Sequence, residues 1–189
     1  ELQLVALLPT RMTNADMARY VDTSDAWIQE RTGIRERRFA AQEEALSDIA
    51  LPAVREALAE ARAVPEEIDL VICATVTPDM LFPTTSALMA DTLGMRNAAA
   101  YDLLAGCTGF MYGITQAYGM LASGLSRKAL VVGGDLLSKI LDWEDRSTLV
   151  LFGDGAGAVV MEPVDSGGFI GFELGADGVL MNTGIACAK

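Results

Sequence analysis

The spacing of hydrophobic residues predicts helices that bury one face. Apolar side chains recur at the period of an amphipathic helix over residues 47–63. A shorter helix is expected to begin at a Thr13 or Asn14 cap, with Met17 and Val21 on its apolar side. Three more helices, each ended by a glycine, are expected over about residues 23–32, 84–93 and 107–123.

Short aliphatic and β-branched runs between these helices predict strands. The run at residues 68–75 is typical of a buried parallel strand, and buried strands are also expected over 98–103 and 127–134. Residues 168–175 are a candidate for a last strand, whereas residues 179–189 carry no clear pattern. Because strands alternate with helices, the pattern predicts βαβ units and a layered α/β fold.

One glycine-rich segment, residues 148–161, allows two interpretations. It resembles a phosphate-binding loop, but such a loop must open a helix, and residues 158–161 are typical of a strand. We therefore favour a glycine-rich turn that packs tightly against neighbouring backbone.

Composition narrows the possible functions. A net charge of −12 argues against a nucleic-acid partner, and no apolar run reaches the roughly 18 residues that a membrane span needs. Three cysteines lie far apart, which fits a reducing cytoplasm better than a disulfide framework. The chain contains no histidine, so it supplies neither a Cys-His pair nor a common zinc site.

The most informative residue is Cys107. The strand over residues 98–103 runs into the small-residue turn Ala-Gly-Cys-Thr-Gly, where a helix is expected to start. There the unpaired N–H groups and the positive end of the helix favour a thiolate, as in a nucleophile elbow with sulfur in place of oxygen. The alternative is a buried cysteine that acts as a small hydrophobic residue.

Three sequence blocks carry a resemblance to a known family. They are VDTSDAWIQERTGIRER at residues 21–37, AGCTGF at 105–110, and DRST followed by FGDGAG between 145 and 157. In this order and at these separations they resemble the β-ketoacyl-acyl-carrier-protein synthase III family. The resemblance extends over about residues 8–178.

The resemblance implies a thiolase-like α/β fold, in which two βαβαβαββ halves pack as α-β-α-β-α layers. Residues 1–178 would form mainly the first half, which carries the nucleophile elbow, and residues 179–189 an unassigned tail. The family completes its active site with a histidine and an asparagine from the second half, and neither is identified here. We therefore expect a full-length enzyme whose C-terminal half is missing from this sequence, and no condensation by these residues alone.

The resemblance also implies an acyltransferase of fatty-acid initiation. A short acyl group moves from acyl-CoA to Cys107, and malonyl-acyl carrier protein then loses CO₂ and attacks the thioester to give a 3-oxoacyl product. The resemblance also implies a homodimer, and a cytoplasmic location is expected. No cofactor or metal is expected, because acyl-CoA is a substrate. The alternatives are polyketide priming, a 3-hydroxy-3-methylglutaryl-CoA synthase type of reaction, and a non-catalytic half-domain.

By the same resemblance, Thr23, Trp27, Arg31 and Arg146 bind CoA. Trp27 with two guanidinium groups offers adenine a flat partner and cation–π contacts. The alternative for Trp27 is a half-buried anchor beneath a short helix.

Two further features suggest binding surfaces. Arg31, Arg35, Arg37 and Arg38 form a local basic cluster that suits CoA phosphates or an acidic carrier protein, unless it is merely a solvated face. Phe82 lies in the apolar loop Met-Leu-Phe-Pro, which is typical of a partner surface unless the loop folds onto its own core. The resemblance implies that Phe82 closes the acyl pocket of the neighbouring subunit.

Overall fold

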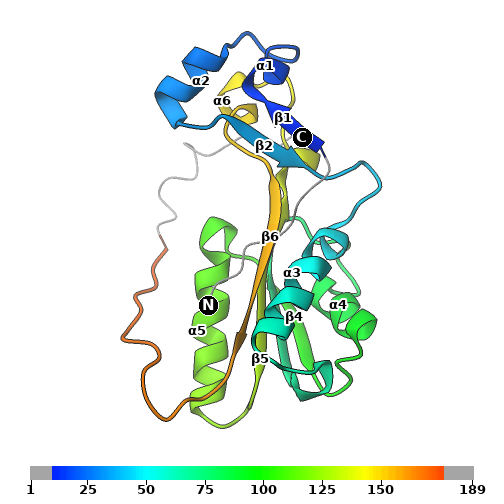
Figure 1. The fold of residues 1–189 in the computed structure, drawn as a ribbon, viewed down its shortest axis with the longest axis vertical. Helices are drawn as coiled ribbons and strands as arrows, with labels where there is room; N and C mark the ends of the chain where they lie inside the picture. The colour runs from blue at the N-terminus through cyan, green and yellow to red at the C-terminus, as the bar shows by residue number, and fades with distance from the viewer. Residues whose placement is uncertain (1–9, 177–189) are drawn as a thin grey trace. The chain divides into compact units, whose positions relative to one another are not determined.

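The computed structural model describes residues 10–176, which divide into two compact units (Figure 1). The larger unit comprises Glu44–Asp135 and Ala156–Leu174. The smaller unit comprises Leu7–Glu43 and Leu136–Gly155, described from Thr10 onward. None of the helices within residues 10–176 has the length and hydropathy that crossing a membrane requires.

A four-stranded sheet forms the centre of the larger unit. Its strands lie in the order β4-β3-β5-β6, and β3 pairs in parallel with both β4 and β5. In register, Ile72 of β3 faces Tyr101 on one side and Val131 on the other. The strands are β3 (Leu70–Ala74), β4 (Ala99–Leu103), β5 (Ala129–Leu136) and β6 (Asp154–Met161).

Helices cover both faces of this sheet. Figure 1 shows α5 (Gly109–Ala122) on one side and α3 (Leu46–Glu60) and α4 (Thr85–Leu93) on the other. Gly113 lets α5 approach β5 of the sheet closely, because a Cβ at this position would lie only 3.0 Å from Val131 Cγ1. The short 3₁₀ turns η1 (Pro65–Glu67) and η2 (Gly106–Thr108) precede β3 and α5.

The smaller unit is built on the antiparallel pair β1 (Thr10–Thr13) and β2 (Glu36–Phe39). Its core is a cluster of buried apolar residues: Met17, Val21, Ile28, Phe39, Leu149 and Val150. Local signals set its helix ends, since Ser24 caps the start of α2 and Gly33 ends it at φ 73°. The helices are α1 (Asn14–Met17), α2 (Asp25–Thr32) and α6 (Arg146–Leu149), with η3 (Leu137–Lys139) as a 3₁₀ turn.

The predicted helices and most strands are confirmed, with differences in position and burial. The strand predicted as buried over residues 98–103 is β4, which lies at the sheet edge and is partly exposed because it has one neighbour. The predicted helix over 47–63 ends at Glu60. The helix expected to start at residue 107 or 108 begins at Gly109, and the first helix ends at Met17.

The last strand predicted, over residues 168–175, is wrong. This segment is coil, with Gly168 at φ 102° and further glycines at 171 and 175. Glycine weakens a strand interior because it loses more backbone entropy and offers no side chain to pack. Phe169 and Phe172 instead make edge-to-face contacts with Tyr118 of α5.

The glycine-rich segment is not a phosphate-binding loop, because strand β6 and not a helix follows it. The expected tight packing is confirmed at Gly153, where a Cβ would lie 3.0 Å from Arg37 Cβ and 3.1 Å from the Arg38 carbonyl oxygen. The glycines at 155 and 157 belong to β6 and not to a turn. The predicted boundary at residue 178, the tail 179–189 and Cys187 lie outside the described residues.

Candidate active site

Cys107 lies in η2, between β4 and α5, and its side chain is exposed. Gly106 adopts φ 58°, a left-handed conformation that glycine tolerates without strain. The Thr108 hydroxyl donates to the Ala105 carbonyl (2.8 Å), which stabilises the tight turn. No side chain caps α5, so the positive end of the helix faces the segment that holds the thiol.

The other described cysteine, Cys73, lies in the middle of the sheet on β3 and is fully buried. Burial raises the pKa of the Cys73 thiol well above its usual value, and the nearby carboxylates of Asp102, Asp79 and Asp135 raise it further. Cys73 is therefore held as a protonated thiol, and Cys107 is the accessible one of these two cysteines.

In the smaller unit, two arginines contact the ring of Trp27. The guanidinium carbon of Arg31 is 4.5 Å from the centre of the Trp27 ring system, and that of Arg146 is 4.8 Å away. Arg146 is held by a hydrogen bond from Nη1 to the Asp22 carbonyl (3.1 Å). Both distances are within the range of cation–π attraction, so α2 and α6 together form an aromatic and cationic surface.

Thr23 directly precedes the cap of α2. Its Oγ1 is buried and, among residues 10–176, has no hydrogen-bond partner. A buried hydroxyl without a partner costs free energy, so an added polar group that reached it would gain a hydrogen bond.

The expected cluster of four arginines is not a single basic surface. Arg31 and Arg35 are exposed and Arg38 is partly exposed, but Arg37 is only 7% exposed. Successive side chains of a strand point to opposite faces, and β2 turns Arg37 inward. The expectation that Arg37 contacts CoA phosphates or a carrier protein is therefore wrong.

The loop that carries Phe82 does not fold onto its own core. Leu81 is 94% exposed and Phe82 86% exposed. The chain after the loop is fixed by Asp102, whose two carboxylate oxygens accept from the backbone N–H groups of Thr85 and Ser86 (both 2.8 Å).

The chain before this loop is fixed in the same way. Asp135 Oδ1 accepts from the Val76 N–H (2.8 Å) and the Thr75 hydroxyl (2.9 Å). The loop therefore presents two large apolar side chains from well-anchored ends. Sequence reasoning did not single out Asp102 or Asp135. A carboxylate within an apolar strand is nevertheless a signal, because a buried carboxylate needs hydrogen-bond donors.

Comparison with known proteins shows what this chain is similar to. A model of the family described as 3-oxoacyl-[acyl-carrier-protein] synthase III matches residues 101–178. The chain is 54% identical over 168 residues to the β-ketoacyl-[acyl-carrier-protein] synthase III of Desulfitobacterium hafniense, which covers 88% of this chain and 51% of the relative. Over most of its length the chain is therefore similar to β-ketoacyl-acyl-carrier-protein synthase III enzymes.

Solved structures of similar enzymes share the fold. The synthase III crystal structure from Thermus thermophilus superposes with a TM-score of 0.89 at 50% identity, over 96% of this chain and 56% of that one. The priming β-ketosynthase of the R1128 polyketide pathway superposes with a TM-score of 0.82 at 39% identity, over 84% of this chain and 48% of that one. The chain spans about half the length of the synthase III relatives it matches.

The site residues expected from the synthase III resemblance thus fall into two groups. Arg31 and Arg146 each contact Trp27 in the smaller unit. Cys107 and Phe82 lie in the larger unit, each exposed. Among residues 10–176, no group of histidine, cysteine or acidic side chains is arranged to hold a metal ion.

Proposed function

We propose that this chain supplies the nucleophile and the CoA site of a β-ketoacyl-acyl-carrier-protein synthase III that starts fatty-acid synthesis. The observation that carries the proposal is the exposed Cys107 in the tight turn before α5, whereas the other described cysteine, Cys73, is buried and protonated. The similarity to synthase III enzymes supports the same reaction. The enzyme needs no cofactor in this scheme, because acyl-CoA is consumed as a substrate.

In the first step the Cys107 thiolate attacks the thioester carbonyl of a short acyl-CoA. Backbone N–H groups at the start of α5 stabilise the oxyanion, and CoA leaves as its thiolate when the carbon–sulfur bond breaks. In the second step malonyl-acyl carrier protein loses CO₂, and its enolate carbon attacks the acyl-cysteine. The Cys107 thiolate is released and a 3-oxoacyl-acyl carrier protein forms.

Trp27, Arg31 and Arg146 bind the adenine end of CoA in this proposal. The cation–π contacts on the Trp27 ring are made within the protein, so the surface is organised before ligand binds. The unpartnered Thr23 hydroxyl offers a hydrogen bond to the same ligand.

Replacing Trp27 with alanine tests the CoA site. We expect acyl-CoA to bind more weakly by ~1–3 kcal/mol, the typical loss of one base–aromatic stack, with little change in kcat. The measurement is calorimetric binding of CoA to the full-length protein. Tyr20→Ala is the matched control, because Tyr20 contacts Trp143 and neither guanidinium is placed over its ring. Unchanged CoA affinity in Trp27→Ala would exclude the assignment.

We further propose that the enzyme is a cytoplasmic homodimer, with Phe82 of one subunit closing the acyl pocket of the other. The exposure of Leu81 and Phe82 supports a protein partner at this loop. The net charge of −12 disfavours nucleic acid, and the free thiols of Cys73 and Cys107 suit a reducing compartment.

Phe82→Asp is expected to convert the dimer into monomers, because it places a charge in an apolar contact. Sedimentation velocity of the full-length protein measures the outcome. Val64→Asp, at another exposed apolar position of the larger unit, should leave the dimer intact. A Phe82→Asp protein that sediments as an unaltered dimer would show that the loop lies outside the interface.

Polyketide priming is the second candidate, since the priming ketosynthase shares the fold. Product analysis with malonyl-acyl carrier protein and alternative acyl acceptors separates the two functions. We expect a 3-oxoacyl chain of fatty-acid synthesis, as the higher identity to synthase III suggests.

A further inference from the structure

The smaller unit contains a buried polar network that joins the elements carrying Trp27, Arg31 and Arg146, three residues that we call the Trp27 surface. Asn14, which is 1% exposed, donates from Nδ2 to Asp25 Oδ1 (2.9 Å) and to the Ile34 carbonyl (2.7 Å). Arg37 donates from Nη1 to Asn14 Oδ1 (2.9 Å) and from Nη2 to the Val150 carbonyl (2.7 Å). We call these contacts the Asn14–Arg37 network.

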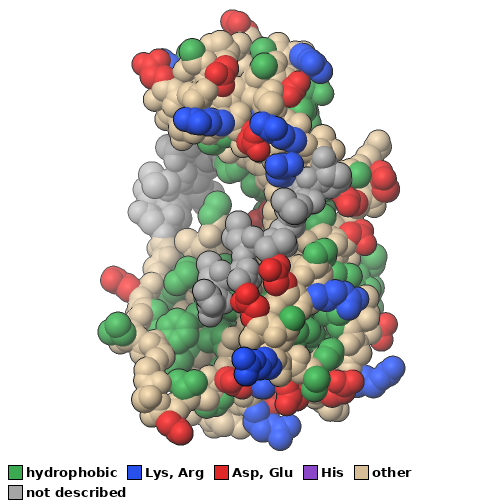
Figure 2. All heavy atoms as spheres, in the orientation of Figure 1, with side chains coloured by type: hydrophobic (Ala, Val, Ile, Leu, Met, Phe, Trp, Pro, Cys, Tyr) green, Lys and Arg blue, Asp and Glu red, His purple; other side chains and the backbone are tan. Residues whose placement is uncertain are grey.

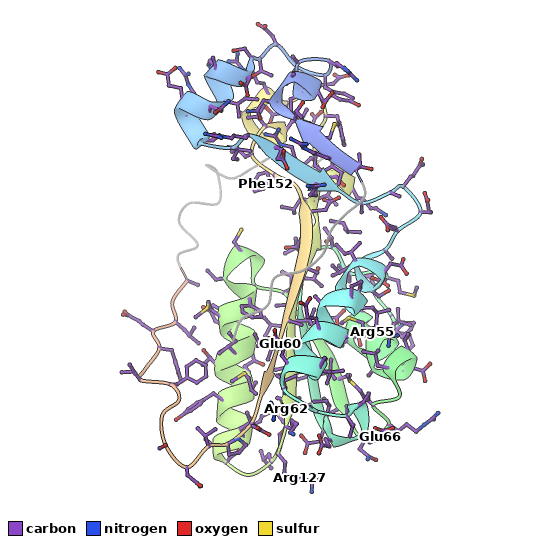
Figure 3. All side chains as sticks on the ribbon, in the orientation of Figure 1. Arg55, Glu60, Arg62, Glu66, Arg127 and Phe152 are labelled. Carbon is purple, nitrogen blue, oxygen red and sulfur yellow. The ribbon has the colours of Figure 1, made fainter. Side chains whose placement is uncertain are left out.

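The network connects the two helices that carry the Trp27 surface. Asp25 begins α2, and Ile34 follows the glycine that ends it, so Asn14 holds both ends of the helix that bears Trp27 and Arg31. Val150 directly follows α6, which bears Arg146, and precedes Phe152, labelled in Figure 3. One guanidinium and one amide therefore join α2 to the end of α6.

We propose that Asn14 and Arg37 are positioning residues of the nucleotide site, which keep Trp27 and Arg31 of α2 in register with Arg146 of α6. The inference rests on the proposed binding of CoA at this surface. Neither residue touches the ligand. Their effect is to fix the distance between two cations and one aromatic ring, on which the stacking surface depends.

The burial of Arg37 supports a structural and not a ligand-binding role. Both of its terminal nitrogens are used within the protein, and no carboxylate contacts it directly among the described residues. Desolvation lowers the pKa of the Arg37 guanidinium below its ordinary value. Burial of a guanidinium costs desolvation free energy, so Arg37 is retained here because its two terminal nitrogens donate to two separate acceptors. A lysine ammonium cannot reproduce that geometry.

The test compares Arg37→Met, Arg37→Lys and Asn14→Ala in the full-length protein, with calorimetric binding of CoA and the kinetics of acetyl-CoA use. We expect each variant to bind CoA about tenfold more weakly and to raise KM with little change in kcat, the typical effect of losing a hydrogen bond to a charged group. Lysine should not rescue binding. Full rescue by Arg37→Lys would mean that only charge matters and would overturn the proposal.

A double-mutant cycle separates positioning from general destabilisation. On a Trp27→Ala background, Arg37→Met should weaken CoA binding by less than about twofold, because the surface it positions is already lost. Asp69→Asn is the matched control. Asp69 accepts from Ser126 and the Arg127 N–H in the larger unit, where Figure 3 labels Arg127. This variant should lower Tm without changing CoA affinity.

The outcomes distinguish this inference from the proposed function. If Trp27→Ala leaves CoA binding unchanged, the CoA site itself is wrong. If Trp27→Ala weakens binding but the Arg37 and Asn14 variants bind CoA normally, only the positioning role is overturned. An effect of Arg37→Met that is equally large with and without Trp27 also overturns it. The milder Arg37→Lys and Asn14→Ala variants keep the test decisive if Arg37→Met fails to fold.

Discussion

Replacing Cys107 with alanine in the full-length protein is expected to abolish acyl transfer. No other described cysteine is exposed, and the acyl group has to be held covalently between the two steps of the proposed reaction. Loss of a catalytic nucleophile typically lowers kcat by about 10⁴-fold or more. Intact-mass measurement after incubation with labelled acetyl-CoA should show one added acetyl group in the parent protein and none in Cys107→Ala.

The buried Cys73 provides the matched control. Cys73→Ala should still accept one acetyl group, because the Cys73 thiol is buried and held in its protonated form. Peptide mapping of the parent protein should place the label on the peptide that contains Cys107. Label on Cys73 or Cys187, or a full-length protein that takes up no label, would refute Cys107 as the nucleophile.

Elements governed by local rules were predictable from the sequence. Helix α2 is capped by Ser24 at its start and by Gly33 at its end. Thr84 and Gly94 cap α4 in the same way, at the positions that capping preferences assign to them. The fully buried β3 likewise follows from an unbroken apolar run. In each case the deciding interactions lie within a few residues along the chain.

Features that depend on distant partners were not predictable in this way. The apolar composition of residues 98–103 does not reveal that β4 has a single neighbour, because strand order is set by the whole sheet. Arg37 lies within a run of charged residues. Its side chain points inward only because β2 pairs with β1 and because the guanidinium donates to the Val150 carbonyl. Polar side chains are buried where donors and acceptors meet, which is a property of the fold.

The candidate site shows both situations. Trp27 and Arg31 are four residues apart on one helix, so their contact follows from helix geometry. The approach of Arg146 from α6 to the same ring requires the fold, and was expected only through the family resemblance. The exposed Phe82 follows from its apolar loop, whereas the carboxylates that anchor the loop ends emerge only in three dimensions.

Expressed alone, residues 1–189 are expected not to catalyse decarboxylative condensation. Loss of CO₂ from the malonyl group creates an enolate, whose oxygen needs donors fixed in advance where the charge develops. The family resemblance implies a histidine and an asparagine as these donors, and the 189 residues contain no histidine. Each missing oxyanion donor typically costs ~10²–10³ in rate. The measurement is 3-oxoacyl formation from acetyl-CoA and malonyl-acyl carrier protein.

The apolar side chains exposed at α5 also affect the expected solubility of residues 1–189 in the same experiment. Met111 and Tyr118 are exposed on this helix and Leu125 just after it, and Figure 2 shows hydrophobic side chains gathered over this part of the larger unit. Such a surface promotes association in water, so residues 1–189 should be poorly soluble. The full-length protein, assayed in parallel, is the control for substrate quality. Soluble residues 1–189 with turnover near that of the full-length protein would show that the condensation step needs no donors beyond this chain.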